Sequence, residues 1–185
     1  MNRRKLLKLV TMATGSALVG GNLVLNGCAR GGLPENLGFS EQDLALLNEI
    51  AEIIIPRTDT PGAKDAEVGK FMAATVNDCY YQDDQDTFHE GLAKINEISR
   101  EHFNTNFINA KQDHRIGLLA ELEIEVREYE KPEGGTEHYF TMMKQLTLMG
   151  YFTSQAGATE SLRHNPVPGR YDGCHPYEEG DPAWA

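Results

Sequence analysis

Apolar residues recur at helical spacing along most of the chain from residue 40 onward. Ser40 and the acidic residues after it form the start of a capping box. The apolar positions that follow repeat every three or four residues until Pro56, which ends the predicted helix. The turn-rich segment 57–64 predicts a loop. The same helical spacing predicts further helices over residues 68–79, 88–98, 118–126 and 139–163.

The last of these helices follows a break at Pro132–Gly135. Thr136 is a residue type that caps helices, so the helix is expected to begin beside it. Gly150 lies inside the apolar pattern, and we expect the helix to bend there before it continues toward Arg163.

Strict alternation of apolar and polar residues is almost absent, so the sequence predicts an all-α fold, a compact bundle of five to six helices. Residues 164–185 contain four of the eight prolines. This composition predicts an extended strap, referred to below as the C-terminal strap, that contacts either its own bundle or a partner. The predicted regions are 1–27, 28–39, 40–163 and 164–185.

The net charge of −11 argues against nucleic-acid binding, because the chain has no basic stripe to contact phosphates. The charge is unevenly distributed. Residues 1–27 contain four basic residues and no acidic one, which leaves 13 basic and 28 acidic residues in the rest of the chain. The N-terminal segment is therefore a different kind of sequence from the remainder.

A basic run containing Arg3 and Arg4 precedes a weakly apolar stretch from Leu9 to Leu25. This order is typical of a secretory signal, and the stretch is too short and too rich in Gly, Ser and Thr for a stable membrane span. The paired arginines resemble a twin-arginine (Tat) signal. The alternative is an ordinary Sec signal that happens to contain two arginines.

The apolar stretch ends with Leu25, Asn26, Gly27 and Cys28, which resembles a bacterial lipobox. In such a motif the cysteine is lipidated and becomes the new N-terminus. The alternative is a chance cysteine near an ordinary cleavage site. The sequence therefore predicts a lipid anchor at Cys28, followed by a flexible tether up to residue 39.

Motifs for catalysis or cofactor binding are missing from the sequence. There is no glycine-rich dinucleotide or phosphate loop, no nucleophile elbow and no zinc-protease motif. The six histidines are scattered, and the acidic run Asp83–Asp86 is better explained as a helix N-terminus than as a calcium loop. We therefore predict no catalytic, cofactor-binding or metal-binding residue in this chain.

Two cysteines remain if Cys28 is lipidated. Cys79 and Cys174 could pair with each other in an oxidising compartment. Alternatively Cys174 bridges to another chain while Cys79 stays a buried thiol on the apolar face of its helix. A nucleophilic pair of Cys174 and His175 is disfavoured, because catalytic Cys and His residues are usually distant in sequence.

Two parts of the chain together resemble the gluconate 2-dehydrogenase subunit 3 family, the small subunits of membrane-associated, FAD-dependent sugar dehydrogenases. The first is residues 53–63, with the run Pro-Arg-Thr-Asp-Thr-Pro-Gly, and the second comprises residues 146–159 and 166–174. The resemblance covers about residues 40–175, and between the two parts it extends only to helical character.

The resemblance implies a non-catalytic accessory subunit without a cofactor of its own. Its expected partner is a large flavoprotein of the GMC type that holds FAD and oxidises the sugar or sugar acid, and a cytochrome c subunit is left open. The small subunit is expected to carry the export signal for the folded pair, and so to reside in the periplasm, anchored to the membrane. Some relatives are linked to the large subunit by a disulfide near the C-terminus, and Cys174 occupies the matching place.

The C-terminal strap supplies candidate partner contacts. Proline stiffens a segment and lowers its ordering cost, while Arg and aromatic residues are frequent interface anchors. The candidates are Pro166, Pro168, Arg170, Tyr171 and Trp184. A free-standing periplasmic lipoprotein that binds a ligand or protein is the alternative to the accessory subunit.

Overall fold

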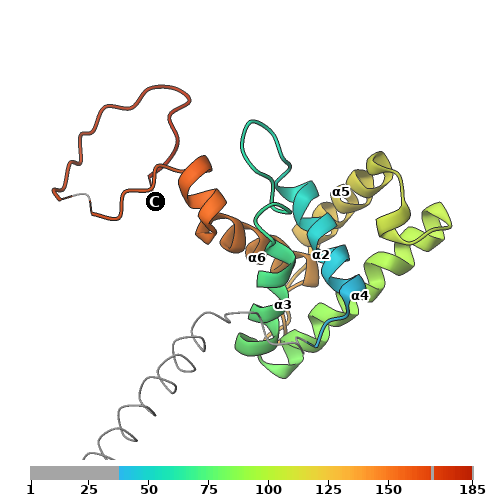
Figure 1. The fold of residues 1–185 in the computed structure, drawn as a ribbon. Coiled ribbons are helices and arrows are strands. Elements are labelled where there is room, and N and C mark those ends of the chain that lie inside the picture. Colours follow the sequence, from blue (N-terminus) through green and yellow to red (C-terminus); the bar gives the residue numbers. More distant parts are fainter. Residues whose placement is uncertain (1–37, 168, 185) are drawn as a thin grey trace, which may run out of the picture. The chain divides into compact units, whose positions relative to one another are not determined.

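The computed structural model describes residues 38–167 and 169–184, and within them it consists of helices and connecting loops (Figure 1). This arrangement confirms the predicted all-α fold. The predicted signal residues Arg3 and Arg4 and the predicted lipid site Cys28 lie outside the described residues. The main helices are α2 (Glu41–Ile54), α3 (Val68–Cys79), α4 (Gln82–Phe103), α5 (Gln112–Glu128) and α6 (Tyr139–Thr153).

Helix α2 begins and ends where the sequence predicts. The Ser40 hydroxyl accepts a hydrogen bond from the Asp43 backbone N–H at 3.2 Å, and the Asp43 carboxylate accepts one from the Ser40 N–H at 2.9 Å. This reciprocal pair satisfies two amides that the helix itself leaves without partners. The helix stops at Ile54, two residues before Pro56.

The sharp turn between α3 and α4 is stabilised by one side chain of α4, that of Gln85. The Gln85 amide nitrogen donates to the carbonyl oxygens of Val76 and Tyr80, at 3.0 and 3.1 Å. These carbonyls lie at the C-terminal end of α3, where the Val76 carbonyl accepts one further hydrogen bond, from the Tyr80 N–H at 3.4 Å. The acidic residues Asp83 and Asp84 occupy the first turn of α4, as predicted from the favourable interaction of negative charge with a helix N-terminus.

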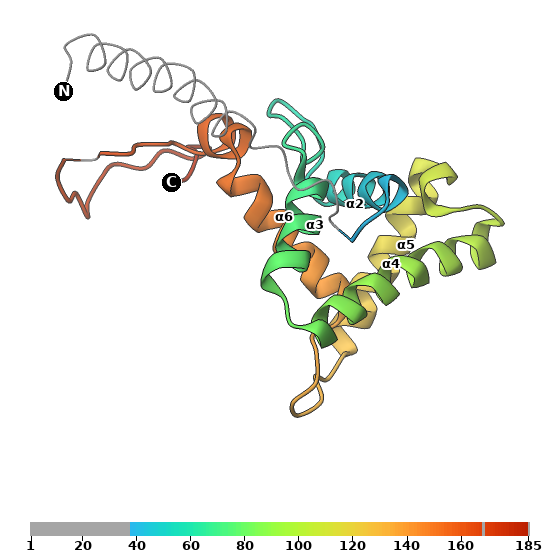
Figure 2. The same ribbon diagram turned by 60° about the horizontal axis from the view of Figure 1, so that its bottom comes forward.

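Helix α6 is the central element of the bundle, since it packs against α2, α3, α4 and α5 (Figures 1 and 2). Its sequence is apolar around most of its circumference, which fits a helix that is covered on several sides. The buried apolar residues that join it to the other helices include Leu47, Ile50, Met72, Val76, Phe88, Ile95, Leu118, Phe140, Met143 and Leu146.

Two local predictions about α6 were wrong. The helix continues through Gly150 to Thr153, and the chain bends at Ser154 before the π-helical turn η2 (Gly157–Ser161). Gly150 is needed for packing, because a Cβ at this position would lie 2.6 Å from the Phe71 ring of α3. At the other end His138, and not Thr136, caps the helix: its Nδ1 accepts from the Phe140 N–H at 3.2 Å.

No helix in the described residues is both long enough and apolar enough to cross a membrane. The C-terminal strap leaves the η2 turn, extends away from it and returns toward Arg163 (Figure 2).

Candidate partner interface

The two parts of the chain that carry the family resemblance meet at Tyr151. Its ring is buried at the end of α6, and its hydroxyl donates a hydrogen bond to the Pro61 carbonyl at 2.6 Å. The same hydroxyl lies 2.6 Å from the Ser161 hydroxyl in η2. One side chain therefore joins the loop after α2 to the turn from which the C-terminal strap departs.

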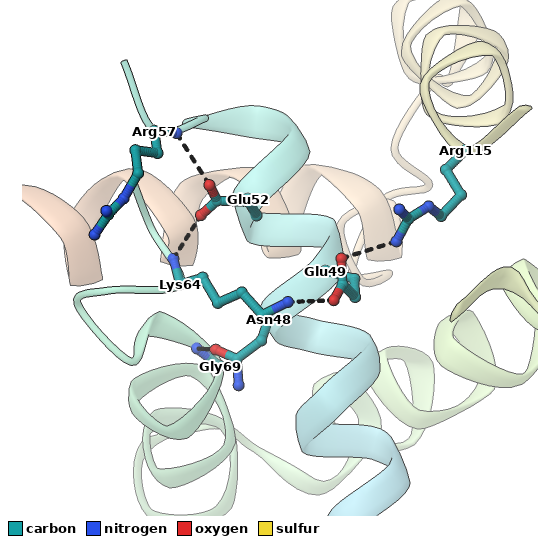
Figure 3. A network of polar contacts seen from close by, with 7 residues as sticks. All are labelled: Asn48, Glu49, Glu52, Arg57, Lys64, Gly69 and Arg115. Atoms are coloured by element: carbon teal, nitrogen blue, oxygen red, sulfur yellow. Dashed lines mark hydrogen bonds and ion pairs between the residues drawn. The ribbon is translucent and has the colours of Figure 1, made fainter. Parts of the chain in front are cut away.

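The loop between α2 and α3 is built around the carboxylate of Glu52 (Figure 3). One oxygen accepts the Arg57 backbone N–H at 3.0 Å, and the other accepts the Lys64 backbone N–H at 2.9 Å. A single carboxylate thus fixes both ends of the loop and satisfies two backbone donors that no helix would pair. The loop has little room in its interior. A Cβ added at Gly62 would overlap the Glu52 carboxylate and would lie 2.7 Å from the Arg57 nitrogen.

A second carboxylate, that of Glu49, connects three elements. It forms ion pairs with Lys64 of the loop and with Arg115 of α5, the latter at 2.8 Å (Figure 3). Partial burial by itself raises the pKa of the Glu49 carboxyl, but the hydrogen bonds and charges of Lys64 and Arg115 outweigh burial and leave the pKa below its ordinary value. Close by, the Asn48 side chain accepts the Gly69 N–H at 3.0 Å and ties α2 to α3.

Arg57 is an exposed charged residue of this loop. Its guanidinium holds Asp65 through both carboxylate oxygens, at 2.8 and 2.6 Å. The same carboxylate accepts the Gly62 N–H at 2.9 Å. Hydrogen bonding by Arg57 and by Gly62 lowers the pKa of Asp65, so its carboxylate keeps these partners to a lower pH than an unpaired aspartate would.

Large apolar side chains are exposed on the last two turns of α6. Leu148, Met149 and Phe152 are each at least 40% exposed, although they lie on the helix that forms the centre of the core. Exposed apolar side chains that adjoin one another are typical of surfaces that bind another protein or a ligand.

The C-terminal strap adds exposed apolar and aromatic residues beyond this point. Tyr171 is 96% exposed, and Val167 and Tyr177 are exposed as well. Arg170 and Pro166 are also exposed, so these predicted contact residues do not lie against the bundle. The sequence allowed the strap to contact either its own bundle or a partner. These residues do not cover the bundle.

The remaining predicted site residues fall in different places. Trp184 does not project freely: it packs on Arg163 and on the edge of His175, with 56% of its surface exposed. Pro168 lies outside the described residues, as do Arg3, Arg4 and Cys28. Among the described residues, no three His, Cys, Asp or Glu side chains are grouped so that they could hold a metal ion.

The two described cysteines do not form a disulfide with each other. Both Cys79, at the end of α3, and Cys174, in the strap, are exposed free thiols. The prediction of a buried thiol at position 79 was wrong, because this residue falls in the last turn of α3, outside the part of the helix that is covered.

The residues that organise this end of the molecule were not identified from the sequence. Glu49, Glu52, Tyr151 and Arg163 act through partners outside their own helical turns. Tyr151 lies within the family segment 146–159, but nothing in the sequence indicates its contact with Pro61. The only local signal was the run Pro-Arg-Thr-Asp-Thr-Pro-Gly, whose turn residues predicted the loop but not the carboxylate at its centre.

The described residues form a small all-α bundle with exposed apolar side chains on α6 and on the strap. Residues 41–169 match the family model described as gluconate 2-dehydrogenase subunit 3, and the chain belongs to this family. It is therefore a subunit of an oxidoreductase complex of the gluconate 2-dehydrogenase type. Comparison with curated proteins found no match, and comparison with solved structures found none either.

Proposed function

We propose that this chain is the non-catalytic accessory subunit of a periplasmic, membrane-associated dehydrogenase that oxidises a sugar or a sugar acid. Its partner is a large GMC-type flavoprotein that holds FAD. In this proposal the chain escorts the folded flavoprotein through the Tat pathway, stabilises it and anchors it to the membrane.

The observation that supports this proposal best is the exposure of large apolar side chains on two segments, the end of α6 and the C-terminal strap. They include Phe152 and Met149 of α6 and Tyr171 and Val167 of the strap, all of them exposed in the single chain. Aromatic and apolar side chains of this kind gain most from burial against a second protein. On α6, Phe152 lies next to Tyr151, whose contact with Pro61 is where the two family segments meet.

The export and anchoring roles follow from the N-terminal sequence. A flavin is bound in the cytoplasm, so a flavoprotein that works in the periplasm has to cross the membrane in its folded state. A twin-arginine signal at Arg3 and Arg4 serves that purpose, and lipidation at Cys28 holds the exported complex at the membrane. Cys174, an exposed thiol in the strap, is our candidate for a disulfide with the large subunit.

The proposal is tested by expressing the tagged chain in its native host and purifying it from membranes together with any partner that it binds. An affinity tag inserted in the exposed loop at residues 132–135 leaves the strap free. We expect the tagged chain to purify from membranes with a partner that shows a flavin absorption spectrum and oxidises gluconate or a related sugar with an artificial electron acceptor. A non-reducing gel of the same sample reports the Cys174 disulfide, which a Cys174→Ser variant should lack.

Replacing Arg3 and Arg4 by lysines tests the escort role. We expect both chains to remain in the cytoplasm, because Tat export requires the arginine pair. A matched control replaces Lys5 and Lys8 by arginines, which preserves the charge of the segment and the arginine pair. If the flavoprotein reaches the periplasm equally well with the lysine pair, the escort role is wrong. If the native chain purifies as a stable monomer without a flavoprotein, the accessory-subunit proposal is wrong and a free-standing lipoprotein is favoured.

A further inference from the structure

The C-terminal strap turns back to Arg163, the residue that directly precedes it. Residues 164–167 and 169–180 are exposed, and the chain then returns so that Arg163 and Trp184 lie side by side in a parallel bridge (Figure 2). The Arg163 backbone N–H donates a hydrogen bond to the Ala183 carbonyl at 2.8 Å. The strap is therefore a loop with joined ends, and not an extended arm.

The side chain of Arg163 makes two further contacts across this closure. Its guanidinium forms an ion pair with Asp181, and its central carbon lies 5.3 Å from the centroid of the Trp184 ring. Both groups are attractive partners for a guanidinium, the carboxylate by charge and the indole through its π-face. We call these four residues, Arg163, Asp181, Ala183 and Trp184, the clasp.

Two contacts within the strap place the clasp residues. The Asp181 carboxylate accepts the Glu178 N–H at 3.1 Å, and the Asp181 N–H donates to the Glu178 carbonyl at 3.0 Å. The His175 ring meets the Trp184 ring edge to face, with centroids 5.4 Å apart. The looped strap encloses an open hollow of about 520 Å³, whose lining includes Asp172, Tyr177 and Trp184.

A closed loop has a different binding property from a free arm. Joining the ends of a segment of this length removes much of its conformational freedom, and the contacts of Arg163 offset that cost within the subunit itself. Tyr171 is then already presented in the middle of the loop, with 96% of its surface exposed, before any partner arrives. Binding by a preformed loop loses less entropy than binding by an arm that has to be ordered.

We propose that the strap binds the large subunit as this closed loop, with the clasp intact, and inserts Tyr171 into a concave apolar site on the partner. This inference rests on the proposed function and specifies the form in which the strap is recognised. If the strap instead bound as an opened arm, the charged pair of Arg163 and Asp181 would have to separate and find new partners, which costs binding energy.

The clasp has a built-in reporter, because Trp184 is the only tryptophan of the chain. Its fluorescence, and its accessibility to the neutral quencher acrylamide, report whether the ring is packed on Arg163. The variants are Arg163→Glu and Asp181→Arg, each of which places two like charges in the clasp, and the double variant, which restores an ion pair of reversed polarity. Affinity for the purified flavoprotein subunit is measured on the same four proteins.

We expect each single variant to increase the quenching of Trp184 and to weaken binding of the flavoprotein by roughly tenfold, the size of effect that lost preorganisation can produce. The double variant restores the ion pair but not the contact of the guanidinium with the Trp184 ring, so it should recover most of the affinity and part of the protection from quenching. That recovery separates the clasp from a direct contact between Arg163 and the partner, because a lost direct contact would not return when Asp181 becomes arginine.

The control is Lys111→Glu, a charge reversal at an exposed position before α5, which should change neither quenching nor affinity. If the single variants open the clasp and the flavoprotein binds as tightly as before or more tightly, the strap binds as an open arm and the inference is overturned. If quenching does not change in the single variants, the clasp itself is wrong. If the native chain does not bind the flavoprotein while its quenching responds as expected, the proposed function fails and the clasp remains.

Discussion

The helical bundle and the C-terminal strap differ in where their large side chains lie: the bundle buries them and the strap exposes them. In the bundle, large side chains such as Phe88, Phe107 and Tyr151 are almost completely buried. In the strap, Tyr171 and Tyr177 are exposed, and Arg163 holds the two ends together through its backbone N–H and its side chain. Contacts within the single chain bury the large side chains of the bundle, whereas they leave those of the strap exposed.

The difference separates residues that stabilise the subunit from residues that are available to a partner. Burial of apolar surface is the main favourable contribution to folding, so a residue that is exposed in the single chain contributes little to its stability. Its contribution appears when a second protein covers it. Substitutions in the two regions should therefore affect two different measurements.

The largest effect is expected from a pair of aromatic substitutions, one in each region. Phe88→Ala removes a fully buried ring from the core and should lower the free energy of unfolding by about 3–5 kcal/mol. Tyr171→Ala should change it by less than about 0.5 kcal/mol, because the ring is exposed. Urea denaturation of both variants and of the native chain measures the difference.

In a binding measurement we expect the opposite order of the two variants: Tyr171→Ala should weaken binding more than Phe88→Ala does. Tyr171→Ala should weaken the complex with the flavoprotein by about tenfold or more, as is typical of an aromatic anchor. If Tyr171→Ala destabilises the isolated subunit as strongly as Phe88→Ala, the division into a folding region and a binding region is wrong.

A smaller effect is expected where the two regions join. Tyr151→Phe keeps the buried ring but removes the hydroxyl that donates to the Pro61 carbonyl and pairs with Ser161. Loss of these hydrogen bonds should cost about 1–2 kcal/mol. Hydrogen exchange should show faster opening of the loop around Thr58, whose N–H donates to the Thr60 carbonyl.

The matched control for this change is Tyr81→Phe, since the Tyr81 side chain is exposed before α4. We expect it to leave both the stability and the exchange of the loop unchanged. Equal exchange of the loop in the native chain and in Tyr151→Phe would mean that Tyr151 does not couple the loop to η2.

The smallest effect concerns the pH dependence of the bundle. The Glu49 pKa is lowered in the folded chain, so its ionised form stabilises the fold above its ordinary pKa of 4.5, and this contribution is lost as the pH falls through the lower folded-state value. Glu49→Gln should therefore cost about 1 kcal/mol near neutral pH, a magnitude between those of exposed and buried pairs. The difference from the native chain should shrink below pH 4.5.

Chemical denaturation at a series of pH values measures this difference. Glu133→Gln is the control, because Glu133 is exposed in the loop between α5 and α6 and forms none of the ion pairs found among the described residues. A difference between the native chain and Glu49→Gln that stays constant down to acidic pH would show that the two ion pairs of Glu49 do not stabilise the fold.

Features that depend on a few neighbouring residues could be predicted from the sequence. The start of α2 follows from the capping box of Ser40 and Asp43, and its end follows from Pro56. The exact bounds of α3 follow from the apolar period and the turn residues before it. In each case the signal and the structural feature lie within about one helical turn of each other.

Features that depend on packing between distant elements could not be predicted. Gly150 looked like a bend, yet it lets α6 pass close to Phe71. Thr136 looked like a cap, yet its hydroxyl pairs with that of Thr87 on α4, at 3.0 Å, and His138 caps α6 instead. The local residue type was informative in both cases, but its use was set by a neighbour far away in the chain.

The sequence by itself determined the helices and the family segments, because periodicity, caps and motifs are written in consecutive residues. The export and lipid motifs at Arg3, Arg4 and Cys28 stay predictions from the sequence. Tertiary structure alone decided that Tyr151 reaches Pro61, 90 residues away, and that Arg163 holds Trp184 and Asp181. The physical reason is that a hydrogen bond or ion pair between distant residues exists only after α6 has packed into the bundle and the chain has turned back at its C-terminal end.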